Sequence, residues 1–305
     1  MLSLEDAKSD IKQRMLRRMS APGKYATSLE NVLFYRRNAV EKPRDCLYKP
    51  MIVYLAQGRK IATSGAGKIT FGENDLLIVG IDYPSTSHMV EASPDKPSLA
   101  MSIDLDMNLI GQLSLTMSYP TLADSSQTSA LMLQPMDAEI LDAFLRLDTA
   151  LDRPEEVAVL GPMIIKEVHF RLLIGPNGDH LRSLYSYGTR KNHVAQAVSW
   201  LRNNFKEAFN VEDLAEKVHM SASTLHRHFK EITSLSPVQF QKRLRLHEAQ
   251  RLMLAEDLSI SEVCHAIGYE NVAQFTREYK RLFGEPPCRD VMRGKRVKLS
   301  LAVAE

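Results

Sequence analysis

The sequence predicts an α+β protein in two parts: a small antiparallel β-barrel with helices, then an all-α domain holding two helix-turn-helix motifs. Three observations predict this architecture. Short strand-like runs, separated by turn residues, fill the stretch after residue 30. Amphipathic helical patterns come next, and one helical pattern then occurs twice near the C-terminus. We expect domains at residues 1–174 and 193–295, joined by a linker at 175–192.

The small positive excess of charge lies in the second part. Residues 1–192 contain 22 Lys/Arg and 23 Asp/Glu, whereas residues 193–305 contain 17 and 14. Five basic residues gather at the C-terminal end: Arg289, Arg293, Lys295, Arg296 and Lys298. This asymmetry is compatible with nucleic-acid binding but is too mild to establish it.

Cysteine usage and hydropathy indicate the cellular compartment of the protein. Cys46, Cys264 and Cys288 are widely spaced and form no Cys-x-x-Cys pair, which argues against a disulfide framework or zinc ribbon and fits a reducing cytosol. No apolar run has the length of a signal peptide or of a membrane span, which needs about 20 residues. We expect a cytoplasmic protein with no membrane partner.

The first domain is predicted from its alternation of short apolar runs and turns. Residues 3–19 indicate an amphipathic helix packed on this domain; the alternative, a basic membrane-surface helix, is opposed by its acidic residues. Seven strands are expected after it: 32–36, 51–57, 59–63, 68–71, 75–81, 87–92 and 98–105. A barrel of this size can hold one small ligand. Tyr54 and His88 alternate with apolar residues and are the candidate effector contacts, with a structural role as the alternative.

Beyond Asp106 the pattern becomes helical. Helices are expected at 107–115, 137–151 and 155–174, and the run Gly175-Pro176-Asn177-Gly178 ends the last of them. The apolar faces of the two longer helices need a partner. Packing against the same helices of a second chain is favoured over packing on the barrel, so we expect a homodimer.

The second domain carries a repeated helix-turn-helix pattern. In the first copy, a short helix over 211–218 and a polar break over 219–221 precede a basic helix over 222–230. The second copy repeats this order over 260–280. Such a motif lays its second helix in the DNA major groove. A helix from Pro237 to Glu256 separates the copies; at 1.5 Å per residue it is a rod of roughly 28 Å. Successive major-groove faces are about 34 Å apart, so the rod suits two adjacent turns of DNA.

These motifs resemble a known family. The residues that carry the resemblance are Met220-Ser221, Leu225 to Lys230, Ser236-Pro237, Lys242 to Leu246, Gly268-Tyr269, Gln274-Phe275, Arg277 to Tyr279, Arg281 to Gly284 and Pro286-Pro287. Over residues 193–292 the chain resembles a bacterial AraC/XylS-family transcriptional regulator. Its first half is similar to the cupin-like sensor of one AraC subgroup, through Gln57 to Lys60, Tyr83-Pro84, Glu91 to Pro94 and Pro97 to Leu99.

The resemblance implies a function and a set of contacts. A dimer would bind double-stranded promoter DNA on the bacterial nucleoid, respond to a small-molecule effector, and contact RNA polymerase if it is an activator. The base-reading residues would be Ser223, His226, Arg227, Val272, Ala273, Thr276 and Arg277. Lys230 and Lys280 would contact phosphate. Arginine can donate two hydrogen bonds to guanine. Val272 and Ala273 cannot hydrogen-bond to bases, so the second helix is expected to read fewer bases.

Other functions receive less support from the residues. His219, His226 and His228 do not share a helix face, so a metal site there is disfavoured. A cupin-type metal enzyme needs several converging histidines, and we expect no catalytic residue, metal or cofactor. Cys46 is a weak candidate for redox or electrophile sensing, with packing as the simpler role. A constitutive regulator whose barrel only dimerises is the remaining alternative.

Overall fold

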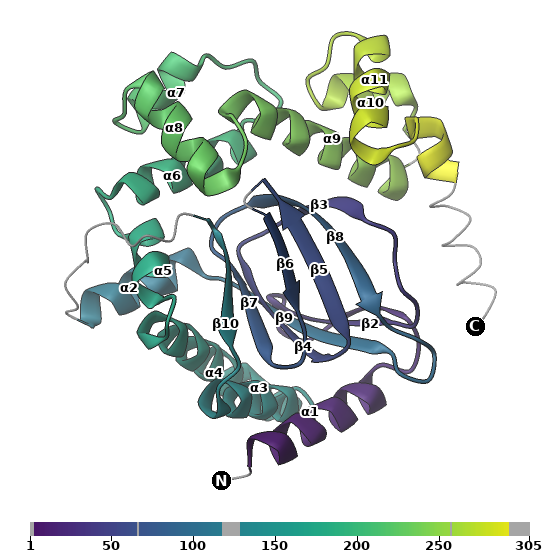
Figure 1. Ribbon diagram of the computed structural model, residues 1–305, viewed down its shortest axis with the longest axis vertical. Coiled ribbons are helices and arrows are strands. Elements are labelled where there is room, and N and C mark those ends of the chain that lie inside the picture. The colour runs from purple at the N-terminus through teal and green to yellow at the C-terminus, as the bar shows by residue number, and fades with distance from the viewer. Residues whose placement is uncertain (1–2, 66, 118–128, 257, 293–305) are drawn as a thin grey trace.

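The computed structural model describes residues 3–65, 67–117, 129–256 and 258–292. It confirms a mixed α/β chain whose N-terminal part is built on β-sheets and whose C-terminal part is helical (Figure 1). Of the basic C-terminal residues, those from Arg293 onward lie outside the described ranges.

The N-terminal domain contains two antiparallel sheets. The larger has the order β1-β2-β9-β4-β7-β10, and the smaller β3-β8-β5-β6. The strands are β1 Gly23–Ala26, β2 Val32–Arg37, β3 Arg44–Tyr48, β4 Met51–Gln57, β5 Arg59–Ser64, β6 Gly67–Phe71, β7 Asp75–Val79, β8 Tyr83–Glu91, β9 Ser98–Asp104 and β10 Leu131–Pro135. No strand pairing joins the two sheets within the described ranges, so closure into a barrel is not confirmed.

Five helices accompany the sheets: α1 Leu4–Arg18, α2 Met107–Thr116, α3 Ala138–Ala150, α4 Pro154–Ile174 and α5 Gly178–Tyr185. The larger sheet is buried on both faces. Along β4, Ile52 and Tyr54 belong to the core shared with α1, α3 and α4. Leu55 belongs to a second core, shared with the smaller sheet. Since successive strand residues point to opposite faces, one face of β4 meets helices and the other meets β-structure.

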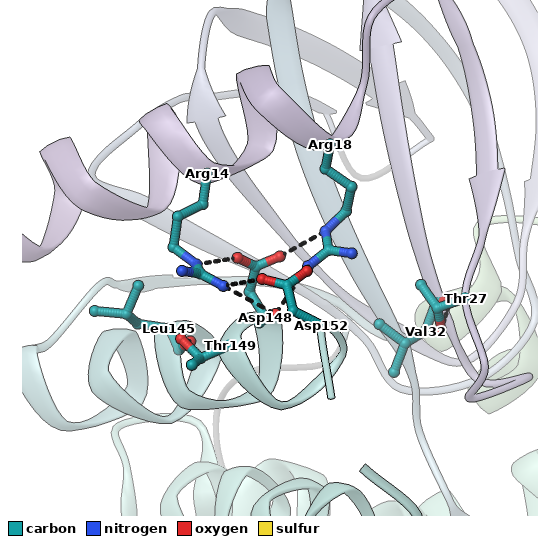
Figure 2. A network of polar contacts seen from close by, with 8 residues as sticks. All are labelled: Arg14, Arg18, Thr27, Val32, Leu145, Asp148, Thr149 and Asp152. Atoms are coloured by element: carbon teal, nitrogen blue, oxygen red, sulfur yellow. Dashed lines mark hydrogen bonds and ion pairs between the residues drawn. The ribbon is translucent and has the colours of Figure 1, made fainter. Parts of the chain in front are cut away.

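Helix α1 is fixed to α3 by an ion-pair network (Figure 2). Arg14 Nε lies 2.6 Å from Asp148 Oδ2, and Arg18 Nε lies 2.9 Å from Asp148 Oδ1. Both guanidinium groups also reach Asp152, at 2.5 and 2.7 Å. The Asp148 side chain is fully buried, and the two cations satisfy it. The N-terminal helix is thus an integral part of the first domain, as its expected packing role requires.

Four elements were not anticipated from the sequence. Strands β1 and β3 are short and carry charged or polar residues, which hides their pairing with β2 and β8. Strand β10 follows the helical pattern that begins at Asp106, yet its residues pair with β7 from Leu131 to Pro135. The predicted linker 175–192 contains helix α5, in which Leu181 and Leu184 are fully buried. The domain boundaries themselves stay a prediction.

Within the described ranges, the C-terminal domain contains the helices α6 Arg190–Asn203, α7 Val211–Lys217, α8 Ala222–Thr233, α9 Pro237–Ala255, α10 Ile260–Ala266 and α11 Val272–Phe283, followed by a further helical stretch at residues 287–292. They lie along one end of the sheet domain, with α9 bridging α7–α8 and α10–α11 (Figure 1). Helix α9 has 19 residues and begins with a capping box formed by Ser236 and Gln239. The predicted helix from Pro237 to Glu256 is therefore confirmed, and its C-terminal end lies one residue earlier than expected.

Polar and apolar contacts join the two domains. Arg243 on α9 pairs with Asp45 on β3 at 3.0 Å, and Arg202 on α6 pairs with Asp82 at 3.1 Å. Side chains of α6, α7, α8 and the start of α9 belong to the same apolar core as the inner strand residues. The first half of the helical domain is thus continuous with the sheet domain.

Candidate nucleic-acid interface

The first helix-turn-helix is formed by α7 and α8. Asn210 caps α7, and Ser221 caps α8 by accepting from the Thr224 amide. Between the helices, His219 adopts φ of 55°, a left-handed conformation that is uncommon for a residue with a side chain. Leu225 and Phe229 are fully buried, which turns the opposite face of α8 to the outside.

The second helix-turn-helix repeats this construction with α10 and α11. Its left-handed turn residue is Gly268, with φ of 80°. A Cβ at this position would lie 2.1 Å from the Lys206 carbonyl oxygen, so only glycine fits. Phe275 and Tyr279 are fully buried, in the positions that Leu225 and Phe229 occupy in the first unit.

Arg245 on α9 ties the two units together. Its guanidinium donates to the carbonyl oxygens of Phe205 at 2.6 Å, Gly268 at 2.8 Å, and Lys206 and Glu207 at 3.0 Å. Gln241 donates to two carbonyls of the same segment, those of Phe205 and Glu207. These bonds join the loop before α7 to the turn after α10. The sequence pattern contained Arg245 but gave no sign of this role.

The predicted base-reading residues lie on the outer faces of the two second helices. On α8, Ser223, His226 and Arg227 are exposed. On α11, Val272, Ala273 and Arg277 are exposed and Thr276 is partly exposed. Lys230 and Lys280, the expected phosphate contacts, are exposed near the C-terminal ends of the same helices. The structure thus gathers each predicted set on one face, while contact with DNA remains a prediction.

The acidic side chain beside Arg277 is neutralised within the fold. Glu278 accepts from Lys242 at 2.9 Å, Tyr269 at 2.6 Å and Gln274 at 3.3 Å. Burial raises the pKa of Glu278, but the bonds from Tyr269 and Lys242 outweigh this, and the net pKa is lowered. An anion that is held and paired in this way interferes less with an approaching phosphate backbone.

The two candidate effector contacts lie outside the space between the sheets. Tyr54 is fully buried on the helix side of β4, and its ring packs edge-on against Phe144 at 5.8 Å. His88 and Met89 are adjacent on β8, so their side chains point to opposite faces of the smaller sheet. Met89 belongs to the core between the sheets, so His88, which pairs with Ile61, faces away from that core. Their role in effector binding stays a prediction.

Other polar residues do face the space between the sheets. Lys60 shares a strand face with Ala62, and Ser102 shares one with Ala100; both alanines belong to the core that the two sheets share. Tyr48 belongs to the same core. Burial lowers the pKa of Lys60, but the nearby Tyr48 phenol and Cys46 thiol outweigh this and the net pKa is raised, so Lys60 carries its charge at neutral pH. Sequence alternation does not reveal this position, because the inner face of β5 carries Lys60, Ala62 and Ser64, while the apolar Ile61 lies on the other face.

The remaining histidines and cysteines have structural surroundings. Within the ranges that the structure describes, no group of three or more His, Cys, Asp or Glu side chains is arranged to hold a metal. His169 accepts from the Asp106 amide at 3.0 Å, and His180 lies 2.8 Å from Lys191. Burial raises the pKa of Cys46, whose thiol donates to the Ser85 carbonyl, which opposes formation of the reactive thiolate. No described helix has the length and apolar character needed to cross a membrane.

Two exposed helices held at a fixed separation by a third match the arrangement with which helix-turn-helix proteins read adjacent segments of a duplex. The comparisons with known proteins agree. The model of the AraC-type transcriptional regulator N-terminus matches residues 28–180, half of the chain, and a helix-turn-helix domain model matches residues 214–290. The chain belongs to the family of AraC-type transcriptional regulators, which confirms the resemblance of its motifs.

Relatives and solved structures agree with this assignment. The chain is 33% identical over 102 residues to the transcriptional activator RhaS of Pectobacterium carotovorum, covering 33% of this chain and 37% of that protein. For RhaS of Pectobacterium atrosepticum the identity is 29% over 136 residues, or 45% and 47% of the two chains. The matches thus span less than half of these curated relatives.

The solved structures extend the likeness to most of the chain. The apo form of a ToxT variant from Vibrio cholerae covers 88% of this chain and 99% of its own, with a TM-score of 0.60 and 8% identity. ToxT bound to (E)-4-(8-methylnaphthalen-1-yl)but-3-enoic acid covers 86% and 99%, with a TM-score of 0.55 and 9% identity. At such identities the likeness shows the fold alone.

Proposed function

We propose that this chain is a sequence-specific DNA-binding transcription regulator that responds to a small-molecule effector. The observation that carries the proposal is the pair of exposed faces on α8 and α11, joined through α9 and Arg245. Ser223, His226 and Arg227 would read bases through the first unit, and Val272, Ala273, Thr276 and Arg277 through the second. Lys230 and Lys280 would position the chain on phosphate.

The effector would bind the cupin-like N-terminal domain and act through its contacts with the helical domain. Ion pairs from Asp45 and Asp82 reach that domain directly. The ToxT structures, one of which holds an unsaturated fatty acid, support a ligand in this fold. Bound ligand would shift the population of chains whose two reading units are correctly held for DNA.

A second copy of the chain is the proposed partner of helix α4. Val159, Met163, Phe170 and Ile174 are 64%, 63%, 40% and 48% exposed, and their spacing of four, seven and four residues places them on one face. Beside them, α3 and α4 border a groove of about 530 Å³ lined by Leu145, Ile164 and both signs of charge. A protruding apolar row next to a groove suits a two-fold interface, in which each copy offers both parts.

The dimer interface can be tested with matched variants. We expect Met163→Asp to convert a dimer into a monomer in sedimentation experiments, because it places a charge in the centre of the apolar row. Val40→Asp is the control, since Val40 is 62% exposed on another part of the surface. Equal effects of the two variants, or a monomeric wild type, would contradict the proposed interface.

The DNA-reading function can be tested by selection of bound duplexes from a random library at a stated salt concentration. We expect half-sites made of two short blocks about one helical turn apart. Recovery of a single block would mean that one unit does not read bases. Failure to enrich any sequence would contradict the proposed function. RNA polymerase is a further partner if the regulator is an activator, as the RhaS relatives are named.

A further inference from the structure

The polar groups between the two sheets include a cation that no carboxylate neutralises. The Lys60 side chain is partly buried on the inner face of β5, with its ammonium nitrogen 5.3 Å from the centre of the Tyr48 ring. Among the described residues, no hydrogen bond or ion pair connects Lys60 to an acid. Burial by itself would lower the pKa of this ammonium, and the contacts that keep its pKa raised come chiefly from the Tyr48 phenol and the Cys46 thiol rather than from a bonded carboxylate.

The acids around Lys60 are engaged elsewhere. Its neighbour Arg59 pairs with Glu91 at 3.1 Å. Glu41 pairs with Arg37 at 3.2 Å, and Asp45 pairs with Arg243. These pairs leave the inner face of the smaller sheet with one positive charge.

Two hydroxyl groups on the same inner faces also lack a partner. Tyr48 Oη and Ser102 Oγ are buried and make no hydrogen bond within the described protein. A buried polar group without a partner costs about 1–3 kcal/mol. Tyr48 belongs to the smaller sheet and Ser102 to the larger, so each sheet contributes one such hydroxyl. The surrounding side chains are apolar and include Leu55, Phe71 and Met89.

From these observations we propose that the effector is a small organic acid, whose carboxylate binds Lys60 while an apolar body lies between the sheets. This rests on the proposed function, because it names the chemical class of the effector. The carboxylate supplies the anion that Lys60 lacks and accepts from the Tyr48 or Ser102 hydroxyl. An uncharged ligand of the same shape leaves the ammonium unpaired and binds more weakly.

The strand that carries Lys60 also touches the first DNA-reading helix. β5 ends at Ser64, and a Cβ on the next residue, Gly65, would lie 2.6 Å from the Cβ of Ser234. Ser234 is the left-handed C-cap of α8. The Tyr83 hydroxyl lies 3.0 Å from Ser64 Oγ and 3.2 Å from Ser234 Oγ. A ligand that repositions β5 therefore acts on the end of α8 through direct contact.

The test uses full-length protein and four probes at matched ionic strength: butyrate, octanoate, benzoate and the neutral octanamide. The melting temperature is measured against probe concentration, and affinity for the selected DNA site is measured with and without probe. We expect at least one carboxylate to raise the melting temperature saturably and to change DNA affinity, with octanamide at least tenfold weaker than octanoate.

Two variants locate the effect. Lys60→Met should weaken carboxylate binding at least tenfold while still unfolding cooperatively without probe, since methionine keeps most of the apolar length of the side chain. Lys68→Met is the matched control, because Lys68 is exposed on the same β5–β6 hairpin and should leave binding intact.

Two results would overturn the proposal: no carboxylate raises the melting temperature, or Lys60→Met responds to the probes like the wild type. If the wild type still selects a DNA site in those cases, the DNA-reading function stands and only the acid site is lost. If no site is selected under any condition, the proposed function is what fails.

Discussion

The two helix-turn-helix units share a plan but differ in what supports them. The core of the first unit, around Leu225 and Phe229, is continuous with that of the sheet domain. The second unit has a core of its own, around Phe275 and Tyr279. Its main link to the first unit is α9 with the bonds of Arg245. The first unit is thus anchored to the effector domain, whereas the second is held at the far end of a rod.

The largest difference between the units is expected at their turns. Gly268→Ala should destabilise the helical domain by roughly 3 kcal/mol or more, because its Cβ would overlap the backbone of Lys206. The corresponding change in the first unit, His219→Gly, should be within about 1 kcal/mol of neutral, because it relieves a left-handed side-chain residue. Urea unfolding measures both. Similar losses at the two positions would show that the turns are equally constrained.

The link between the units should be the next most sensitive point. Arg245→Met should cost about 2–3 kcal/mol, since it removes charged hydrogen bonds to four carbonyl oxygens. Binding to the two-block site should fall further than binding to either block alone, because the units lose their fixed separation. Arg251→Met is the control, as the hydrogen bonds of the exposed Arg251 within the described residues go to the side chain of Glu248. Equal losses on one-block and two-block sites would contradict a linking role.

Acid should loosen the second unit before the first. His247 on α9 is partly buried and packs edge-on against Phe283, and burial, aided by Arg243, lowers its pKa to about 4. The unfolded value is about 6.5, so the stability it contributes is complete above pH 6.5 and is lost as the pH falls towards 4. Hydrogen exchange should show α11 amides losing protection over this range, by up to about 2 kcal/mol, before those of α8.

His180 has a similarly lowered pKa, so a variant is needed to isolate the second unit. His247→Leu should flatten the dependence of α11 protection on pH while leaving that of α5 unchanged. A profile that is the same in the variant and the wild type would assign the effect to other groups.

The smallest expected difference concerns base reading. Arg227→Ala should weaken binding to the selected site by about 1–2 kcal/mol and leave random DNA little affected. Arg277→Ala should cost less, since its neighbours Val272 and Ala273 add no hydrogen bonds to fix the register of α11. Competition binding at constant salt compares the two. A larger loss from Arg277→Ala would mean that the second unit carries most of the specificity.

The helical domain could be predicted from sequence because its signals are local. Caps such as Ser236 and the left-handed Gly268, together with the 3.6-residue period, set the bounds of each helix within a few positions. The sheet domain depends on pairing between distant strands, which no local pattern encodes. Tyr54 illustrates the limit: both faces of β4 are buried, so alternation cannot tell which face meets the helices.

The candidate sites show the same difference between local signals and contacts that depend on the whole fold. The predicted DNA-reading residues lie on one face of each helix because helical spacing alone determines that face. The inner position of Lys60, and the engagement of Glu91 and Asp45 by other cations, depend on how β5 is placed beside β8 and the helical domain. A charge is recognised as unpaired only when its whole surroundings are known.

The continuous helix α9 also sets an angular relation between the two reading helices. Each residue of an α-helix advances the chain by 1.5 Å but turns it by about 100°. Inserting one residue within α9 would barely lengthen it, yet would point α11 to a different side of the duplex. The rotation of α11 about the axis of α9, rather than its distance from α8, therefore limits the operator spacings that such a regulator can read. The length of α9 can vary only in steps near whole helical turns.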